Sequence, residues 1–168
     1  EAWRGVYDKY SAQVWLYVSR WVGSDAHAVA DVVQETFLAV TKNWDQFDPA
    51  RGTIWAWISG IAHKQAALFW RKRSRNQSES REQTIDSAAT PDDSAESPIA
   101  ALELAETVEE VRRVMAELNS GYAALLIAKY ADGSSLAELH ERFGGTLEGV
   151  RSKLARARRE FRERFAKQ

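Results

Sequence analysis

A turn containing proline and glycine interrupts the helical pattern of residues 31–75 and constrains the fold more than any other feature of the chain. Pro49 fixes one backbone angle and lacks an N–H, and Gly52 relieves another, so a helix must end on each side of the FDPARG segment. Apolar residues recur at helical spacing before and after it. The sequence therefore predicts two consecutive helices, over residues 26–44 and 53–75.

The second of these helices changes from aromatic to purely cationic along its length. No acidic residue lies between Asp48 and Glu79. Cations hold phosphates and aromatic rings stack on unpaired bases, so the pattern favours nucleic acid over a solvated face. Trp57 is assigned to the core, whereas Trp55 and Trp70 lie off the main apolar stripe and are the candidates for base stacking. The full set of candidate contacts is Trp55, His63, Lys64, Trp70, Arg71, Lys72, Arg73 and Arg75.

This stretch resembles the promoter-opening domain of extracytoplasmic-function (ECF) sigma factors, which are small bacterial transcription initiation subunits. The residues that carry the resemblance are Asp31, Val33, Gln34, Glu35, Thr36 and Phe37, the turn at 47–52, and Trp57, Ile61 and Ala62. The resemblance implies that the aromatic and cationic helix recognises and melts the −10 element. The family often has Asn where this chain has Lys64, which leaves the preferred −10 base open because Lys lacks the paired donor and acceptor of Asn.

The helix before the turn carries a polar face that the apolar stripe does not use. On composition alone this is a solvated acidic face. The resemblance instead implies that it docks on a coiled coil of the polymerase largest subunit, with exposed carboxylates meeting basic helices. The residues expected to bind core RNA polymerase are Asp31, Gln34, Glu35 and Leu38.

The C-terminal part predicts a helix-turn-helix. Ser135 and Glu138 form a capping-box pattern at the start of a short helix, Gly144 and Gly145 supply the turn, and a long basic helix begins at Leu147. A solvated cationic face is the alternative interpretation. The segment also resembles the −35-binding part of ECF sigma factors, which implies DNA contacts by Arg151, Ser152, Lys153, Arg156 and Arg158.

Charge is distributed unevenly although the net charge of the chain is −1. Residues 1–75 hold 10 Lys/Arg against 7 Asp/Glu, residues 76–110 hold 1 against 10, and residues 111–168 hold 12 against 7. Residues 76–98 are rich in Ser, Asp and Glu and too polar to fold alone. We therefore expect an all-α protein of two small helical domains, residues 1–75 and 99–168, joined by a flexible acidic linker over residues 76–98. The resemblance implies that the first is sigma domain 2 and the second sigma domain 4.

Other functional classes lack a signal. The chain has no cysteine, and its three histidines have no ligand or catalytic partner at a spacing that metal or enzyme motifs use. No apolar run approaches the roughly 18 residues that span a bilayer. We expect no enzymatic activity, no cofactor, no membrane insertion, and a cytoplasmic location.

The predicted function is that of an ECF-type sigma factor that binds core RNA polymerase and promoter DNA. The main rival is a stand-alone helix-turn-helix regulator, which would explain residues 135–165 but not 31–75. A helical adaptor that binds only protein is a second rival. An anti-sigma factor that clamps both domains is a further hypothesis, motivated by the tether and the two separable basic faces.

Overall fold

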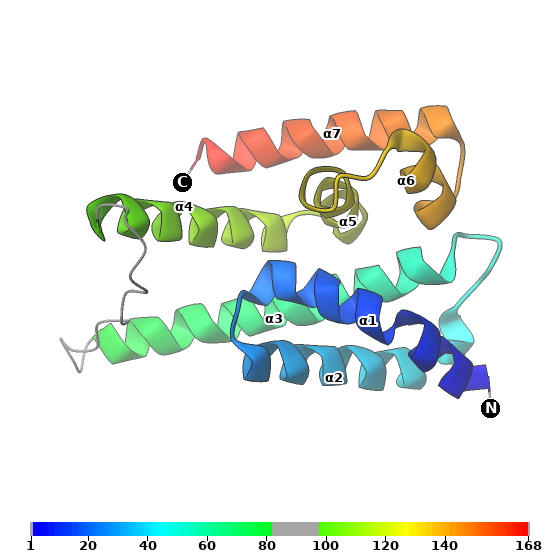
Figure 1. Ribbon diagram of the computed structural model, residues 1–168, viewed down its shortest axis with the longest axis horizontal. Coiled ribbons are helices and arrows are strands. Elements are labelled where there is room, and N and C mark those ends of the chain that lie inside the picture. Colours follow the sequence, from blue (N-terminus) through cyan, green and yellow to red (C-terminus); the bar gives the residue numbers. More distant parts are fainter. Residues whose placement is uncertain (1, 82–97, 168) are drawn as a thin grey trace.

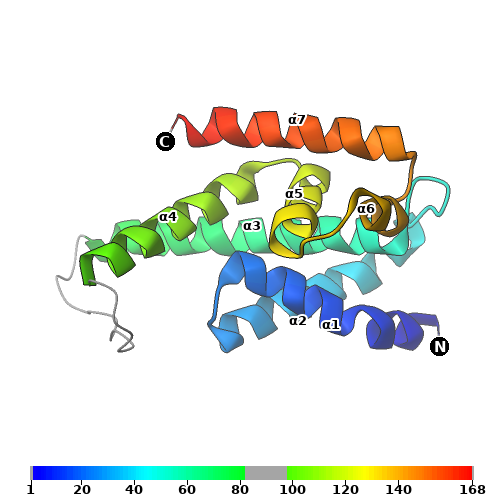
Figure 2. The ribbon, with the colours of Figure 1, turned by 45° about the horizontal axis from the view of Figure 1, so that its top comes forward.

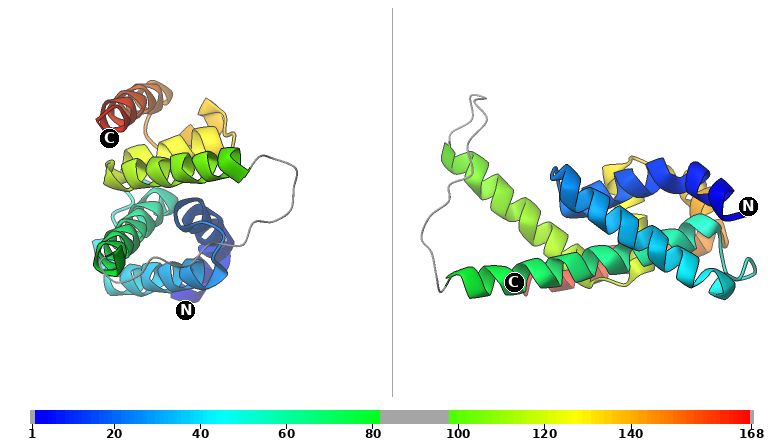
Figure 3. Two further views of the ribbon diagram at one scale, coloured as in Figure 1. Left: turned by 90° about the vertical axis from the view of Figure 1, so that its left-hand side faces the viewer. Right: turned by 90° about the horizontal axis from the view of Figure 1, so that it is seen from below.

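The computed structural model describes residues 2–81 and 98–167, and the regular elements in these ranges are all helical. They form three layers, which are seen end-on in the left view of Figure 3. Helices α1, α2 and α3 make one layer, α4, α5 and α6 the middle layer, and α7 the outer layer (Figure 1). The all-α class predicted from the sequence is confirmed.

The first half of the chain is a three-helix bundle, and a short polar side chain caps the start of its second and third helices. Its elements are α1 (Ala2–Val22), α2 (Ala26–Lys42), a 3₁₀ turn η1 (Trp44–Gln46) and α3 (Ile54–Arg81). The Asp25 carboxylate accepts the N–H groups of His27 at 3.0 Å and Ala28 at 3.2 Å, which satisfies free donors at the start of α2. The Thr53 hydroxyl accepts the N–H of Ala56 at 3.1 Å and caps α3 in the same way.

Helix α3 is longer than predicted. The expected linker began at residue 76, but α3 continues to Arg81, and α4 begins at Pro98. The sequence of residues 76–81 contains only polar residues, so it has no apolar periodicity that could have indicated a helix there. The remainder of the predicted linker, 82–97, lies outside the described residues.

The second half packs four helices and one π-helical turn against the bundle. Its elements are α4 (Pro98–Glu117), α5 (Ser120–Leu126), the π turn η2 (Ile127–Ala131), α6 (Leu136–Phe143) and α7 (Leu147–Phe165). Ser135 and Glu138 form the predicted capping box of α6. Gly144 and Gly145 turn the chain with φ of 75° and 88°, values that favour glycine, and α7 follows. The predicted helix-turn-helix is present.

The two halves share one hydrophobic core. Helix α5 lies between α3 and α7, and residues 123–128 are all buried (Figure 2). Side chains of the first bundle, including Trp21 and Ile58, belong to the same buried cluster as Leu125 and Leu154 of the second half. The halves are therefore packed together in this structure.

Candidate nucleic-acid and protein interfaces

The polar face of α2 is exposed, as the sequence predicts. Asp31, Gln34, Glu35 and Leu38 all lie on the surface, and the opposite face of the helix is buried in the bundle. Leu38 is 43% exposed and adds an apolar side chain beside these polar neighbours. The four residues thus form one accessible strip.

This strip borders a cleft of about 750 Å³ between α2 and α3. Asp31 and Glu35 line it from α2, and Lys72 and Arg73 line it from α3, with the exposed side chain of Leu68 between them. A cleft with acidic and basic walls and an apolar floor is suited to a charged, amphipathic protein surface.

The two tryptophans assigned to the surface of α3 are buried. Trp55 is 4% exposed and Trp70 is 5% exposed, so the expectation that both lie off the apolar stripe is wrong in this structure. The Trp70 indole N–H donates to the carbonyl oxygen of Trp21 at 3.0 Å. The Trp55 ring meets Tyr17 edge-on at 5.9 Å, and the Arg142 guanidinium lies 5.4 Å from its centre. Trp57, assigned to the core, is only partly buried.

The burial of these rings follows from how α3 is covered. Helices α1 and α2 pack on one side of α3, and α4, α5 and α6 pack on another. A single amphipathic stripe predicts only one covered side. Because α3 is enclosed from two directions, its apolar surface extends around the helix to positions that periodicity assigns to solvent.

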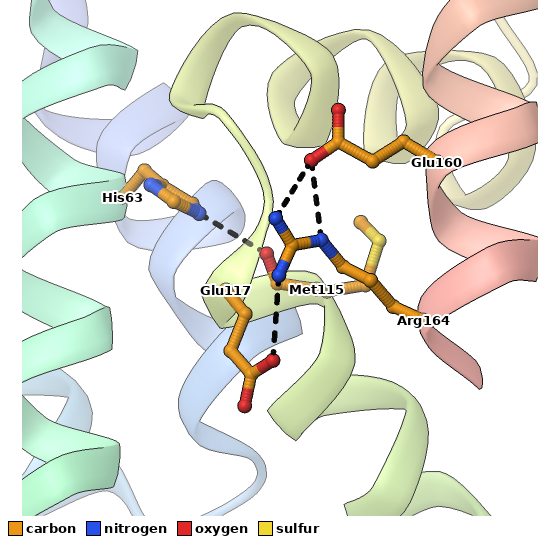
Figure 4. A network of polar contacts seen from close by, with 5 residues as sticks. All are labelled: His63, Met115, Glu117, Glu160 and Arg164. Atoms are coloured by element: carbon orange, nitrogen blue, oxygen red, sulfur yellow. Dashed lines mark hydrogen bonds and ion pairs between the residues drawn. The ribbon is translucent and has the colours of Figure 1, made fainter. Parts of the chain in front are cut away.

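His63, a predicted DNA contact, is also buried, at 5% exposure. Its ring meets Trp21 edge-on at 4.8 Å, and its Nε2 lies 3.1 Å from the carbonyl oxygen of Met115 on α4 (Figure 4). A carbonyl oxygen only accepts, so Nε2 carries the proton and donates. Burial lowers the pKa of His63 below its ordinary value, and the hydrogen bond to Met115 offsets part of that shift. His63 is thus held neutral at the contact between the two halves.

Other polar bridges join the halves around this point. The Thr53 hydroxyl donates to the carbonyl oxygen of Arg142 at 2.6 Å while it caps α3. At the far end of the contact, the Arg112 Nε donates to the carbonyl oxygen of Arg20 at 3.3 Å, and the Arg20 guanidinium pairs with Asp132 at 3.6 Å. The packed arrangement is therefore specified by directional contacts as well as by the shared core.

The exposed cations predicted on α3 remain accessible. Lys64, Arg71, Lys72, Arg73 and Arg75 are all at the surface. They continue the aromatic part of α3 as a basic ridge that is open to solvent and can contact phosphates.

Two of these cations meet further ones from the second half. Lys64 and Arg71 line a cavity of about 840 Å³ together with Arg113 of α4 and Arg164 of α7. Arg164 pairs with Glu117 at 3.6 Å and with Glu160 at 3.0 Å (Figure 4). Sequence reasoning missed Arg113 and Arg164, since only the fold brings these helices beside α3.

The predicted −35 residues are all exposed on α7. Val150, Leu154 and Ala157 point inward, and Arg151, Ser152, Lys153, Arg156 and Arg158 are at the surface, with Arg158 also lining a cavity that α7 shares with α1 and α4. Thr146 caps the helix by accepting the N–H of Gly149 at 3.0 Å. A capped helix N-terminus with exposed cations can approach both base edges and phosphates.

Within the described ranges, no group of His, Asp and Glu side chains could hold a metal ion. The same part of the chain contains no helix that is both long and apolar enough to cross a membrane.

The family described as Sigma-70 region 2 matches residues 6–76. The chain is also 27% identical over 159 residues to ECF RNA polymerase sigma factor SigK of Mycobacterium tuberculosis (strain ATCC 25177 / H37Ra), covering 93% of this chain and 81% of the relative. SigK of Mycobacterium sp. (strain KMS) is 26% identical over 160 residues, covering 92% and 78%.

Two solved structures are similar at lower sequence identity. One is the sigma factor RpoE in complex with the anti-sigma factor NepR from Bartonella quintana, with 18% identity, a TM-score of 0.48, and coverage of 97% of this chain and 96% of that one. The other is CnrH in complex with the cytosolic domain of CnrY, with 23% identity, a TM-score of 0.46, and coverage of 96% and 86%. The region 2 match and the similarity to SigK along most of the chain together support the ECF sigma factors of RNA polymerase as the family that this chain resembles.

Proposed function

We propose that this chain is an ECF sigma factor. It binds core RNA polymerase through the exposed strip of α2 and directs initiation by contacting the −10 element with α3 and the −35 element with α7. In this proposal residues 1–75 act as sigma domain 2 and residues 99–168 as sigma domain 4. Catalysis would belong to the polymerase. The observation that carries the proposal is that Asp31, Gln34, Glu35 and Leu38 form one exposed strip on the helix that matches the family motif.

The α2 strip supports docking on a basic helical surface. Asp31 and Glu35 are one helical turn apart and both exposed, and Leu38 extends the same face with an apolar side chain. Exposed carboxylates of this kind accelerate association and exclude wrong partners, while a desolvated Leu adds affinity. Charge reversal here should therefore weaken binding without unfolding the chain.

The packed arrangement has a consequence for promoter contact. His63 lies under α4 and Trp55 lies beside Arg142 of α6, so neither side chain can reach DNA until the halves separate. Trp70 is held by Trp21 within the first bundle, so base stacking by Trp70 would also require a change inside that bundle. The exposed cations of α3 and α7 need no such change to meet phosphates.

The test is run-off transcription with purified bacterial core polymerase on a pool of candidate promoters. We compare wild type with the double variant Asp31→Lys/Glu35→Lys. The matched control is Glu103→Lys/Glu106→Lys, which makes the same charge change on the exposed face of α4. We expect initiation by the wild type and the control, and a loss of at least tenfold in core affinity for the α2 variant.

Each other outcome has a definite meaning. Equal loss in both variants would assign the effect to net charge and refute the docking face. Initiation unaffected by the α2 variant would keep the sigma function and move the docking surface elsewhere. If the wild type neither initiates transcription nor binds core polymerase, the proposed function is refuted and a stand-alone regulator is favoured.

A further inference from the structure

A cavity of about 620 Å³ lies between α1, α4, η2 and α7, and of its lining residues the proposed function uses only Arg158. This volume is within the range of roughly 300–1,000 Å³ that small-molecule sites occupy. Its walls are largely apolar and come from both halves of the chain. The apolar lining includes Trp21, Val111, Met115, Leu126, Ile127 and Phe161.

Arginines from three helices surround this apolar interior. Arg20 comes from α1, Arg112 from α4, and Arg158 and Arg162 from α7. No Asp or Glu is among the described residues that line the cavity. A hydrocarbon interior with a purely cationic rim is complementary to a molecule that is apolar along its length and negatively charged at one end.

The charges of the rim are incompletely compensated. Arg20 pairs with Asp132 at 3.6 Å, but no carboxylate oxygen of the described residues lies within 4.0 Å of the Arg112, Arg158 or Arg162 guanidinium. Arg112 is half-buried, and burial lowers its pKa, while nearby Glu109 partly opposes the shift. A partly desolvated cation without a paired anion is unfavourable, so an anionic head group placed there gains more than it would in water.

We propose that this cavity binds a single-chain amphiphile with an anionic head group, of the fatty-acid class, with its alkyl chain against the apolar walls and its carboxylate among the rim arginines. A nucleic acid strand fits less well, because its phosphates would have to enter an apolar interior. Since both halves form the walls, the bound amphiphile stabilises the packed arrangement. The bound amphiphile therefore reduces promoter contact by residues that are buried in that arrangement. This regulatory effect rests on the proposed function, whereas the binding itself does not.

The test of binding is calorimetric titration of the full chain with sodium laurate below its critical micelle concentration. Dodecanol and dodecyltrimethylammonium have the same chain length without the negative charge. The variant Arg162→Gln removes one rim charge, and Arg159→Gln is its control, because Arg159 is exposed on the same helix and does not line the cavity. We expect saturable one-to-one binding of laurate, weakened roughly tenfold or more by Arg162→Gln and unchanged in Arg159→Gln.

Several results would overturn the proposal. These are no saturable binding of laurate, equal binding of the cationic amphiphile, or equal loss in both arginine variants. Binding of an acidic amphipathic peptide without binding of laurate would also overturn it, since the cavity would then be a peptide site. Calorimetry uses no polymerase, and run-off transcription without laurate tests the sigma function separately. Failure of the amphiphile proposal is therefore distinguishable from failure of the proposed sigma function.

A transcription arm tests the regulatory effect. Laurate at saturating concentration should lower initiation by wild type and by Arg159→Gln, and should have a smaller effect on Arg162→Gln. Equal inhibition of all three proteins would show that laurate acts on the polymerase and would refute regulation through this cavity.

Discussion

Protonation of His63 should destabilise the packed arrangement. The free energy of unfolding should therefore depend on pH, in a direction that follows from the surroundings of His63. The neutral ring donates to the Met115 carbonyl and is 5% exposed. The cavity beside it is lined by the cations Lys64, Arg71, Arg113 and Arg164, with Glu117 as the only acid among the described lining residues. A proton on His63 would therefore add a buried charge next to an excess of positive charge, and the pKa of His63 is lowered from 6.5, mainly by burial.

The sign follows from proton linkage. The unfolded chain takes up a proton on His63 near its ordinary pKa, whereas the folded chain does so only at lower pH. The stabilising contribution of neutral His63 is therefore complete above about pH 6.5 and is lost as the pH falls towards the folded-state pKa. Between the two pKa values the slope approaches about 1.4 kcal/mol per pH unit for one proton.

Urea unfolding of the full chain between about pH 5 and pH 8 measures this effect. The comparison is with His63→Gln, which cannot titrate. Both proteins keep His27 and His140 in the same exposed positions, so the difference between them reports on residue 63. We expect wild type to lose free energy of unfolding relative to the variant as the pH falls below about 6.5. A difference that is constant over the whole range, or one that favours wild type at acidic pH, would refute the reasoning.

Two further predictions concern the Thr53 contact and the basic face of α7. Thr53→Val keeps the shape of the side chain but removes both its cap on α3 and its hydrogen bond to the Arg142 carbonyl. Urea unfolding should therefore show that the free energy of unfolding falls by about 1–3 kcal/mol in Thr53→Val and by less than about 1 kcal/mol in Thr53→Ser. Equal losses would mean that the shape of the side chain, not its hydrogen bonding, matters there. Lys153→Gln/Arg156→Gln should reduce the slope of log affinity against log salt for holoenzyme on promoter DNA by about 2, at roughly 0.9 per phosphate contact; an unchanged slope would place this face away from the phosphates.

Helix ends and turns were predictable from sequence because they depend on local chemistry. The capping box at Ser135 and the glycine turn before α7 form as expected, and Asp25 and Thr53 cap α2 and α3 by the same local chemistry. In each case a short polar side chain or a glycine satisfies a requirement that arises within a few residues. The exposure of the α2 strip was also predictable, since one stripe of α2 faces its bundle.

The burial of Trp55, His63 and Trp70 was not predictable, because it depends on two coverings of α3 that arise from distant parts of the chain. Periodicity reports only that one side of a helix is apolar. It contains no information on whether a second layer will enclose the other side. The same limit explains why Arg113 and Arg164 were missed, since they approach α3 only after α4 and α7 have packed.

The position of α5 makes separation of the halves thermodynamically demanding. Helix α5 contacts α3 on one side and α7 on the other, and its residues 123–126 are buried. When the halves part, the side of α5 turned towards α3 loses its cover, and so does the facing strip of α3. Such surfaces associate non-specifically when left bare. A partner that keeps the two halves apart must therefore cover these surfaces with apolar area of its own. A partner that contributes only charged groups would leave the packed arrangement as the favoured state.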